Sequence, residues 1–205
     1  MTGAWKIDVN ASGNLPQKVA TAFGKLSEQL VGAEYTPIAY LGEQVVNGTN
    51  YAVLAEQLIL TGKDTKNVVL MIFNVKPNDM EATLVNIERV VESGGELDGI
   101  QVDVQTNIPE EAMTAFNTTL EGFLGSKIEP FALLGTQVTK GTNYIFAAKV
   151  TPMTLNGEPE VQLITVNPMT KDIIFADIMD SKQNVATLGY AFTWLKAAKP
   201  LGEWP

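Results

Sequence analysis

The chain has 205 residues, about the length of one or two ordinary domains, and a formal net charge of −9. It contains no His and no Cys, which excludes Ser-His-Asp and Cys-His catalysis, thiolate metal sites and disulfides. The acidic balance argues against binding to nucleic acid or to an anionic membrane, because both need a basic face. We therefore expect a protein that is not an enzyme and that needs no cofactor and no metal.

The predicted elements of the first half begin with a short strand near residues 5–9. Asn14 ahead of Pro16 is typical of a helix N-cap followed by a proline in the first turn, and Gly32 is placed to end this helix. An apolar stripe at helical spacing lies between them and predicts core residues. The stripe consists of Leu15, Val19, Ala22, Phe23, Leu26 and Leu30.

Four runs that are typical of strands follow the helix. They lie at residues 38–46, 49–60, 67–75 and 82–91. Asn47-Gly48 between the first two runs is a strong hairpin signal, and Lys76-Pro77-Asn78-Asp79 marks the turn between the last two. One helix beside an antiparallel sheet is typical of the α+β class.

The second half of the chain repeats the first. The run from Leu41 to Tyr51, LGEQVVNGTNY, returns as LGTQVTKGTNY from Leu134 to Tyr144, at an offset of 93. At this offset residues 15–55 align with 108–148 without a gap, and 17 of these 41 positions are identical. Identity at this level indicates that the two halves arose by duplication and share one fold.

The duplication predicts the domain boundaries. We expect one domain over residues 1–92 and a second over residues 93–180, joined near Gly94 and Gly95. Residues 181–205 have no counterpart in the first half and form an apolar C-terminal extension. This extension would pack between the domains, cover a face of a sheet or bind a partner.

The motif in the first hairpin carries a family resemblance. Gln44-Val45-Val46-Asn47-Gly48 matches Gln-x-Val-x-Gly and follows a long helix, and a glycine precedes the first strand of each copy, at Gly3 and Gly95. This combination resembles the cystatins, most closely the disulfide-free stefins. The resemblance implies an α+β fold of two cystatin-like domains, each a helix packed on a four- to five-stranded antiparallel sheet, followed by the C-terminal extension.

The resemblance also implies a function, the reversible inhibition of papain-like cysteine peptidases. In that family an N-terminal segment and two hairpin loops fill the active-site cleft of the peptidase. The corresponding peptidase-binding residues in this chain are Gly3, Gln44, Val45, Val46, Asn47, Gly48, Lys76, Pro77 and Asn78.

The second copy is expected to be the weaker binder. Thr139 stands where the motif has Val, and Lys140 brings a charge to the hairpin tip, where burial without a partner is costly. The equivalent residues of this copy are Gly95, Gln137, Val138, Thr139, Lys140 and Gly141.

Another interpretation stays open beside inhibition. Asn47-Gly48 is a good hairpin turn in its own right, and a fold can be kept after its activity is lost, so the alternative is a non-inhibitory binding or scaffold protein. We expect a monomer or a domain-swapped dimer. The N-terminus has no apolar segment of signal-peptide length, so we expect a cytoplasmic protein unless a leader precedes Met1.

Overall fold

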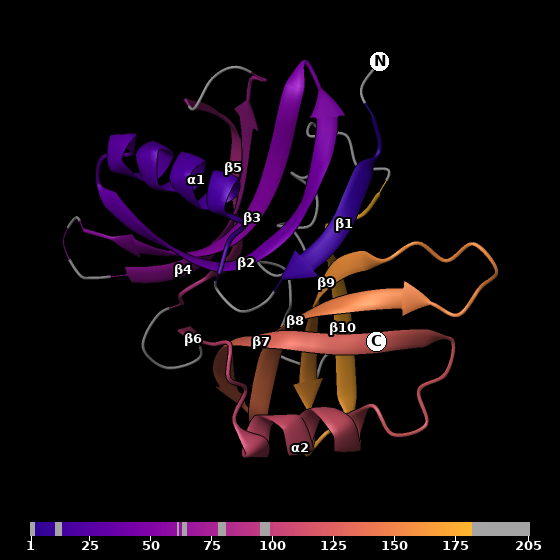
Figure 1. Ribbon diagram of the computed structural model, residues 1–205. Helices are drawn as coiled ribbons and strands as arrows, with labels where there is room; N and C mark the ends of the chain where they lie inside the picture. Colours follow the sequence, from indigo (N-terminus) through magenta and orange to yellow (C-terminus); the bar gives the residue numbers. More distant parts are fainter. Residues whose placement is uncertain are drawn as a thin grey trace, which may run out of the picture.

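The computed structural model describes residues 3–10, 14–60, 62, 65–77, 81–94 and 99–181. These residues form two five-stranded antiparallel sheets, one from each repeat (Figure 1). The apolar extension lies almost entirely outside the described residues, so all three interpretations of it stay predictions. The division into domains at residues 92 and 93 also stays a prediction.

Sheet A belongs to the first repeat and has the strand order β1-β2-β3-β4-β5. Helix α1 (Gln17–Gln29) connects its first two strands. The strands are β1 (Trp5–Asn10), β2 (Ala33–Val46), β3 (Gly48–Ile59), β4 (Thr65–Val75) and β5 (Ala82–Glu92).

Sheet B belongs to the second repeat and has the strand order β10-β9-β8-β7-β6. Helix α2 (Glu110–Thr119) connects β6 to β7, as α1 connects β1 to β2. The strands are β6 (Ile100–Gln105), β7 (Ser126–Thr139), β8 (Gly141–Pro152), β9 (Glu160–Asn167) and β10 (Asp172–Met179).

The predicted fold class is wrong. The part of the chain that the structure describes is mostly β, with 59% strand and 14% helix, and its repeats are not two helix-on-sheet cystatin domains. The physical reason is that each sheet is buried on both of its faces. Residues 68–73 of β4 are all buried, whereas a sheet covered on one face alternates between buried and exposed residues.

The inner faces of the two sheets pack against each other in one core. This shared core contains Leu41, Leu54 and Leu70 from sheet A together with Leu134 and Ile145 from sheet B. Each helix covers the outer face of its own sheet, so the layers run helix, sheet, sheet, helix (Figure 1). Each sheet therefore needs apolar side chains on two faces, one toward the shared core and one toward its own helix.

The two outer cores are smaller and each belongs to one repeat. In the first, the α1 residues Val19, Phe23 and Leu26 pack in one cluster with Met71 and Phe73 of β4. Leu15 and Leu30, at the ends of the predicted stripe, are only partly buried against it. The predicted face of the helix is therefore confirmed at its centre.

The start of each helix differs from the prediction. Pro16 is the N-cap residue of α1 and Pro109 is that of α2, and neither helix has a side-chain cap hydrogen bond. The predicted cap by Asn14 is therefore wrong. The side chain of a proline has no hydrogen-bond acceptor, so a proline at the N-cap position cannot cap the first turn as an asparagine would.

Trp5 joins the N-terminal strand to the shared core. Its side chain is 4% exposed and lies in the cluster that contains residues of both sheets. Its backbone N–H donates to the carbonyl of Ser181 at 3.2 Å, so the last described residue lies beside the start of β1. The two ends of the described chain therefore meet at the outer edge of sheet A.

Candidate functional site

Three segments that are far apart in the sequence meet at one end of sheet A. The N–H of Gly3 donates to the carbonyl of Val45 at 3.0 Å. Gly48 forms the turn of the β2–β3 hairpin with a φ of 103°, and a Cβ atom there would lie 2.7 Å from the carbonyl oxygen of Val75 and 3.2 Å from Cα of Lys76. Only glycine allows the hairpin turn to approach the end of β4 this closely.

We call this meeting point the hairpin edge and define it as Gly3, Val45–Gly48, Lys76 and Pro77. The β2–β3 hairpin turns at the top of the view in Figure 1, beside the N-terminal end and away from sheet B. The predicted residues Asn78 and Gly95 lie outside the described residues. All the other predicted residues of the first copy are brought together here, apart from the buried side chain of Gln44.

The exposed side chains of the hairpin edge are a valine, an asparagine and a lysine with its neighbouring proline. Val45 is 67% exposed, and Asn47, Lys76 and Pro77 are also exposed. Val46 is partly buried. The edge therefore presents one large apolar side chain on a tight turn, with one positive charge near it.

Gln44, which the motif placed among the contacts, faces inward. Its side chain is 5% exposed, and its Nε2 donates to the carbonyl of Gly3 at 2.9 Å. Its Oε1 accepts from Asn50 Nδ2 at 3.0 Å, and Asn50 Oδ1 accepts from Asn74 Nδ2 at 2.8 Å. These side chains form an amide ladder across β2, β3 and β4, which we call the edge ladder.

Sheet B contains the same ladder at the same offset of 93. Asn143 Nδ2 donates to Gln137 Oε1 at 3.1 Å, and Asn167 Nδ2 donates to Asn143 Oδ1 at 2.8 Å. Asn167 Oδ1 then accepts from the backbone N–H groups of Met169 and Thr170 and so shapes the turn before β10. Buried amide groups need partners, and the duplicated ladder provides them in both repeats.

Most of the repeated motif is explained by the fold. Leu41 and its counterpart Leu134 are fully buried in the shared core. Gly42 lies where β1 crosses a bulge in β2, and a Cβ atom there would overlap the carbonyl oxygen of Lys6. Gly135 meets Gln101 in the same way.

Val45 and Val138 are the exception within the motif. They are 67% and 65% exposed, so packing among the described residues does not account for an apolar residue at this position in either repeat. A single exposed apolar residue is ordinary, and this one stands at the same place in both repeats.

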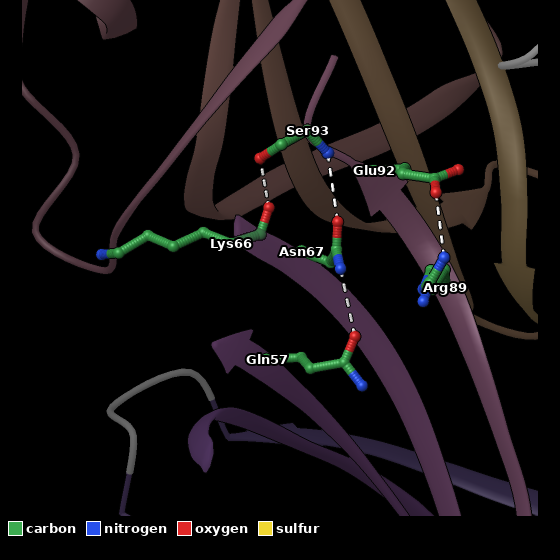
Figure 2. Close-up of polar contacts among 6 residues, drawn as sticks. All are labelled: Gln57, Lys66, Asn67, Arg89, Glu92 and Ser93. Atoms are coloured by element: carbon green, nitrogen blue, oxygen red, sulfur yellow. Dashed lines mark hydrogen bonds and ion pairs between the residues drawn. The ribbon is translucent and has the colours of Figure 1, made fainter. Parts of the chain in front are cut away.

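A second ladder holds the connection between the repeats (Figure 2). Asn67 Nδ2 donates to Gln57 Oε1 at 3.1 Å, and Asn67 Oδ1 accepts from the backbone N–H of Ser93 at 3.2 Å. The hydroxyl of Ser93 donates to the carbonyl of Lys66, and Gln57 Nε2 donates to the hydroxyl of Tyr35 at 3.1 Å. We call this chain of contacts the joint ladder; it ties the residue after β5 to sheet A.

Burial raises the pKa of Tyr40 above its usual range, and the nearby Glu43 and Asp8 add to the shift. Within the described ranges no group of three His, Cys, Asp or Glu side chains could hold a metal ion. No helix among the described residues is long and apolar enough to cross a membrane.

Sequence reasoning missed Asn74, Asn167 and the inward direction of Gln44. The signal was present, because the offset of 93 that aligns the motif also aligns Asn74 with Asn167. Extending the alignment past residue 55 would have shown three amide residues repeated on three successive strands. Repeated amides on facing strands indicate hydrogen bonding between strands rather than a surface for a partner.

No family model matches the chain, and no curated protein is significantly similar to it. The resemblance of the motif to the cystatins therefore stays an interpretation of the residues themselves.

Proposed function

We propose that the chain reversibly inhibits papain-like cysteine peptidases by inserting the hairpin edge of sheet A into the active-site cleft. The observation that carries the proposal is the exposed Val45 on a tight turn, with Gly3 bound beside it. Burying a valine side chain gains roughly 1.5 kcal/mol, and neighbouring backbone would add contacts along the cleft. No bond is made or broken by the inhibitor.

The construction of the edge favours binding. The turn at Gly48 lies against the end of β4, and the hairpin continues into the long β2–β3 pair. A rigid turn loses little conformational entropy when it is buried, so more of the contact free energy appears as affinity. The turn is also narrow, because Gly48 has no side chain.

A titration of papain with the full chain tests this function, with Val45→Asp as the test variant. An unpaired carboxylate in a dry cleft costs several kcal/mol, so we expect at least a hundredfold weaker inhibition. Val138→Asp is the matched control, because Val138 is 65% exposed at the equivalent position of sheet B. Equal inhibition by Val45→Asp and the unchanged chain would exclude the hairpin edge as the contact.

A non-inhibitory binding or scaffold protein is the second candidate. It is favoured by the edge ladder, because Gln44 and Asn50 are needed inside the sheet whether or not a peptidase is bound. A correctly folded chain that leaves papain fully active at micromolar concentration would select this candidate. Val45 would then be the first position at which to look for the partner.

A further inference from the structure

We infer that Gln44 is a positioning residue, which fixes the N-terminal segment onto the hairpin and so completes the binding edge before a partner arrives. This inference rests on the proposed function, since it names what holds the proposed contact residues in place. Gln44 is separated from Gly3 by 41 residues in the sequence, yet its Nε2 lies 2.9 Å from the carbonyl oxygen of Gly3.

Both backbone polar groups of Gly3 are engaged by the hairpin. Its N–H donates to the carbonyl of Val45 at 3.0 Å, and its C=O accepts from Gln44. A Cβ atom on Gly3 would lie 3.1 Å from the Val45 carbonyl oxygen. Gly3 is therefore a held residue in the free protein, and the absence of a side chain lets it lie directly on the edge of β2.

The edge ladder determines which way the Gln44 amide points. Asn50 Nδ2 donates to Gln44 Oε1 at 3.0 Å, which leaves the NH₂ group of Gln44 to face Gly3. Asn74 in turn orients Asn50 through a bond of 2.8 Å. Gln44 and Asn50 are 5% and 7% exposed, so water competes little for their hydrogen bonds. Asn74 on β4 therefore orients Asn50, Asn50 orients Gln44, and Gln44 holds Gly3.

Preordering of this kind affects affinity. A free N-terminal segment would have to be ordered during binding, and ordering the backbone of one residue lowers affinity by about five- to thirtyfold. A segment already held by Gln44 avoids this loss. Part of the proposed affinity therefore comes from a side chain that does not touch the peptidase.

The test compares Gln44→Met with Gln137→Met in the full chain. Each variant removes an amide that accepts from an asparagine of its own ladder, at 3.0 Å in sheet A and 3.1 Å in sheet B. Gln44 is buried and Gln137 only partly buried, so Gln44→Met should lose more stability than Gln137→Met. In the free protein only Gln44→Met should increase the hydrogen-exchange rate of the Gly3 amide, by about tenfold or more.

The inhibition constant for papain supplies a coupled readout. Gln44→Met and Gly3→Pro, which removes the Gly3 N–H, should each weaken inhibition by about five- to thirtyfold. If Gln44 acts through Gly3, the double variant should be no weaker than the stronger single variant. Additive losses, or a Gly3 exchange rate that Gln44→Met leaves unchanged, would overturn the inference. An unchanged chain that does not inhibit papain would overturn the proposed function, while the Gly3 exchange rate would still decide whether Gln44 holds the segment.

Discussion

Asn74 and Asn167 occupy the same place in the two repeats, 93 residues apart, and each donates its side-chain amide to an asparagine on the neighbouring strand at 2.8 Å. The partner is Asn50 in sheet A and Asn143 in sheet B. The two residues differ in what else they do. Asn167 also accepts from two backbone N–H groups of the turn that follows β9. Its side chain therefore holds this turn in addition to its place in the ladder.

We predict that Asn167→Ala destabilises the protein more than Asn74→Ala. Asn167 is 1% exposed, and its removal leaves two turn amides and Asn143 without their partner, at a cost of about 1–3 kcal/mol. Asn74 is only partly buried, so water can replace part of its bond. Urea unfolding of both variants gives the comparison, and an equal loss would contradict it.

The shared core predicts that damage in one repeat spreads to the other. Ile145 is 1% exposed and lies in the same core as Leu70. Ile145→Ala should cost about 2–5 kcal/mol and should reduce hydrogen-exchange protection in both sheets. Leu124→Ala, at a position that is 88% exposed, is the control. Loss of protection confined to sheet B would mean that the repeats unfold independently.

Two glycines of the first repeat should respond to alanine in opposite directions. At Gly42 a Cβ atom would overlap the carbonyl oxygen of Lys6, so Gly42→Ala must push β1 away from β2 and should cost at least about 1–3 kcal/mol. At Gly24, inside α1, a Cβ atom meets nothing within 4 Å. Gly24→Ala should stabilise the helix by about 0.5–1 kcal/mol. Thermal unfolding distinguishes the two, and equal melting temperatures would contradict both assignments.

We predict that the joint ladder holds Ser93, at the connection between the repeats, against sheet A (Figure 2). Asn67 is 1% exposed, and Asn67→Ala leaves Gln57 and the Ser93 N–H without their contacts, at a cost of about 1–3 kcal/mol. The Ser93 amide should also exchange faster. Lys66→Ala is the control, because Ser93 bonds to the carbonyl of Lys66 and not to its side chain. A Ser93 exchange rate unaffected by Asn67→Ala would remove the proposed role of the ladder.

The raised pKa of Glu88 predicts how one part of the protein's stability depends on pH. Burial raises its pKa above the ordinary value of 4.5, so the folded chain holds this proton at pH values where the unfolded chain has lost it. Its contribution to stability is therefore present at low pH and is lost as the pH rises through the raised pKa. Glu88→Gln should stabilise the protein near neutral pH, and the gain should disappear below about pH 4. A gain that persists at low pH would point to a cause other than the charge.

The local structure could be predicted in large part from the residues. The stripe that contains Val19, Phe23 and Leu26 indicates the buried face of α1, and Asn47-Gly48 indicates the hairpin turn, because both depend on neighbours close in the chain. The sequence predicts that the second strand begins at residue 38, whereas β2 begins at Ala33. The first residues of β2 alternate between partly buried and exposed positions. Few of them are strongly apolar, so the sequence gives only a weak strand signal there.

The role of Gln44 could not be predicted from the motif. A glutamine next to a hairpin turn is as compatible with an exposed contact as with an inward hydrogen bond, and the choice depends on Gly3 and Asn50 being close enough to bond to it. The same holds for the run at residues 68–73, whose apolar side chains are needed on both faces only because a second sheet lies against the first.

The sequence by itself determined that the protein is a duplication, that it lacks the histidine and cysteine of common catalytic sites, and where the helices and hairpins lie. These properties follow from composition, identity at a fixed offset and local periodicity. Only the tertiary structure decided that the two sheets share one core, that four of the repeated amides (Gln44, Asn50, Asn143 and Asn167) are buried, and that Val45 and Val138 remain exposed. Those properties depend on contacts between residues far apart in the chain. Local periodicity shows that a strand has an apolar face, but it does not show which other sheet or helix packs against that face.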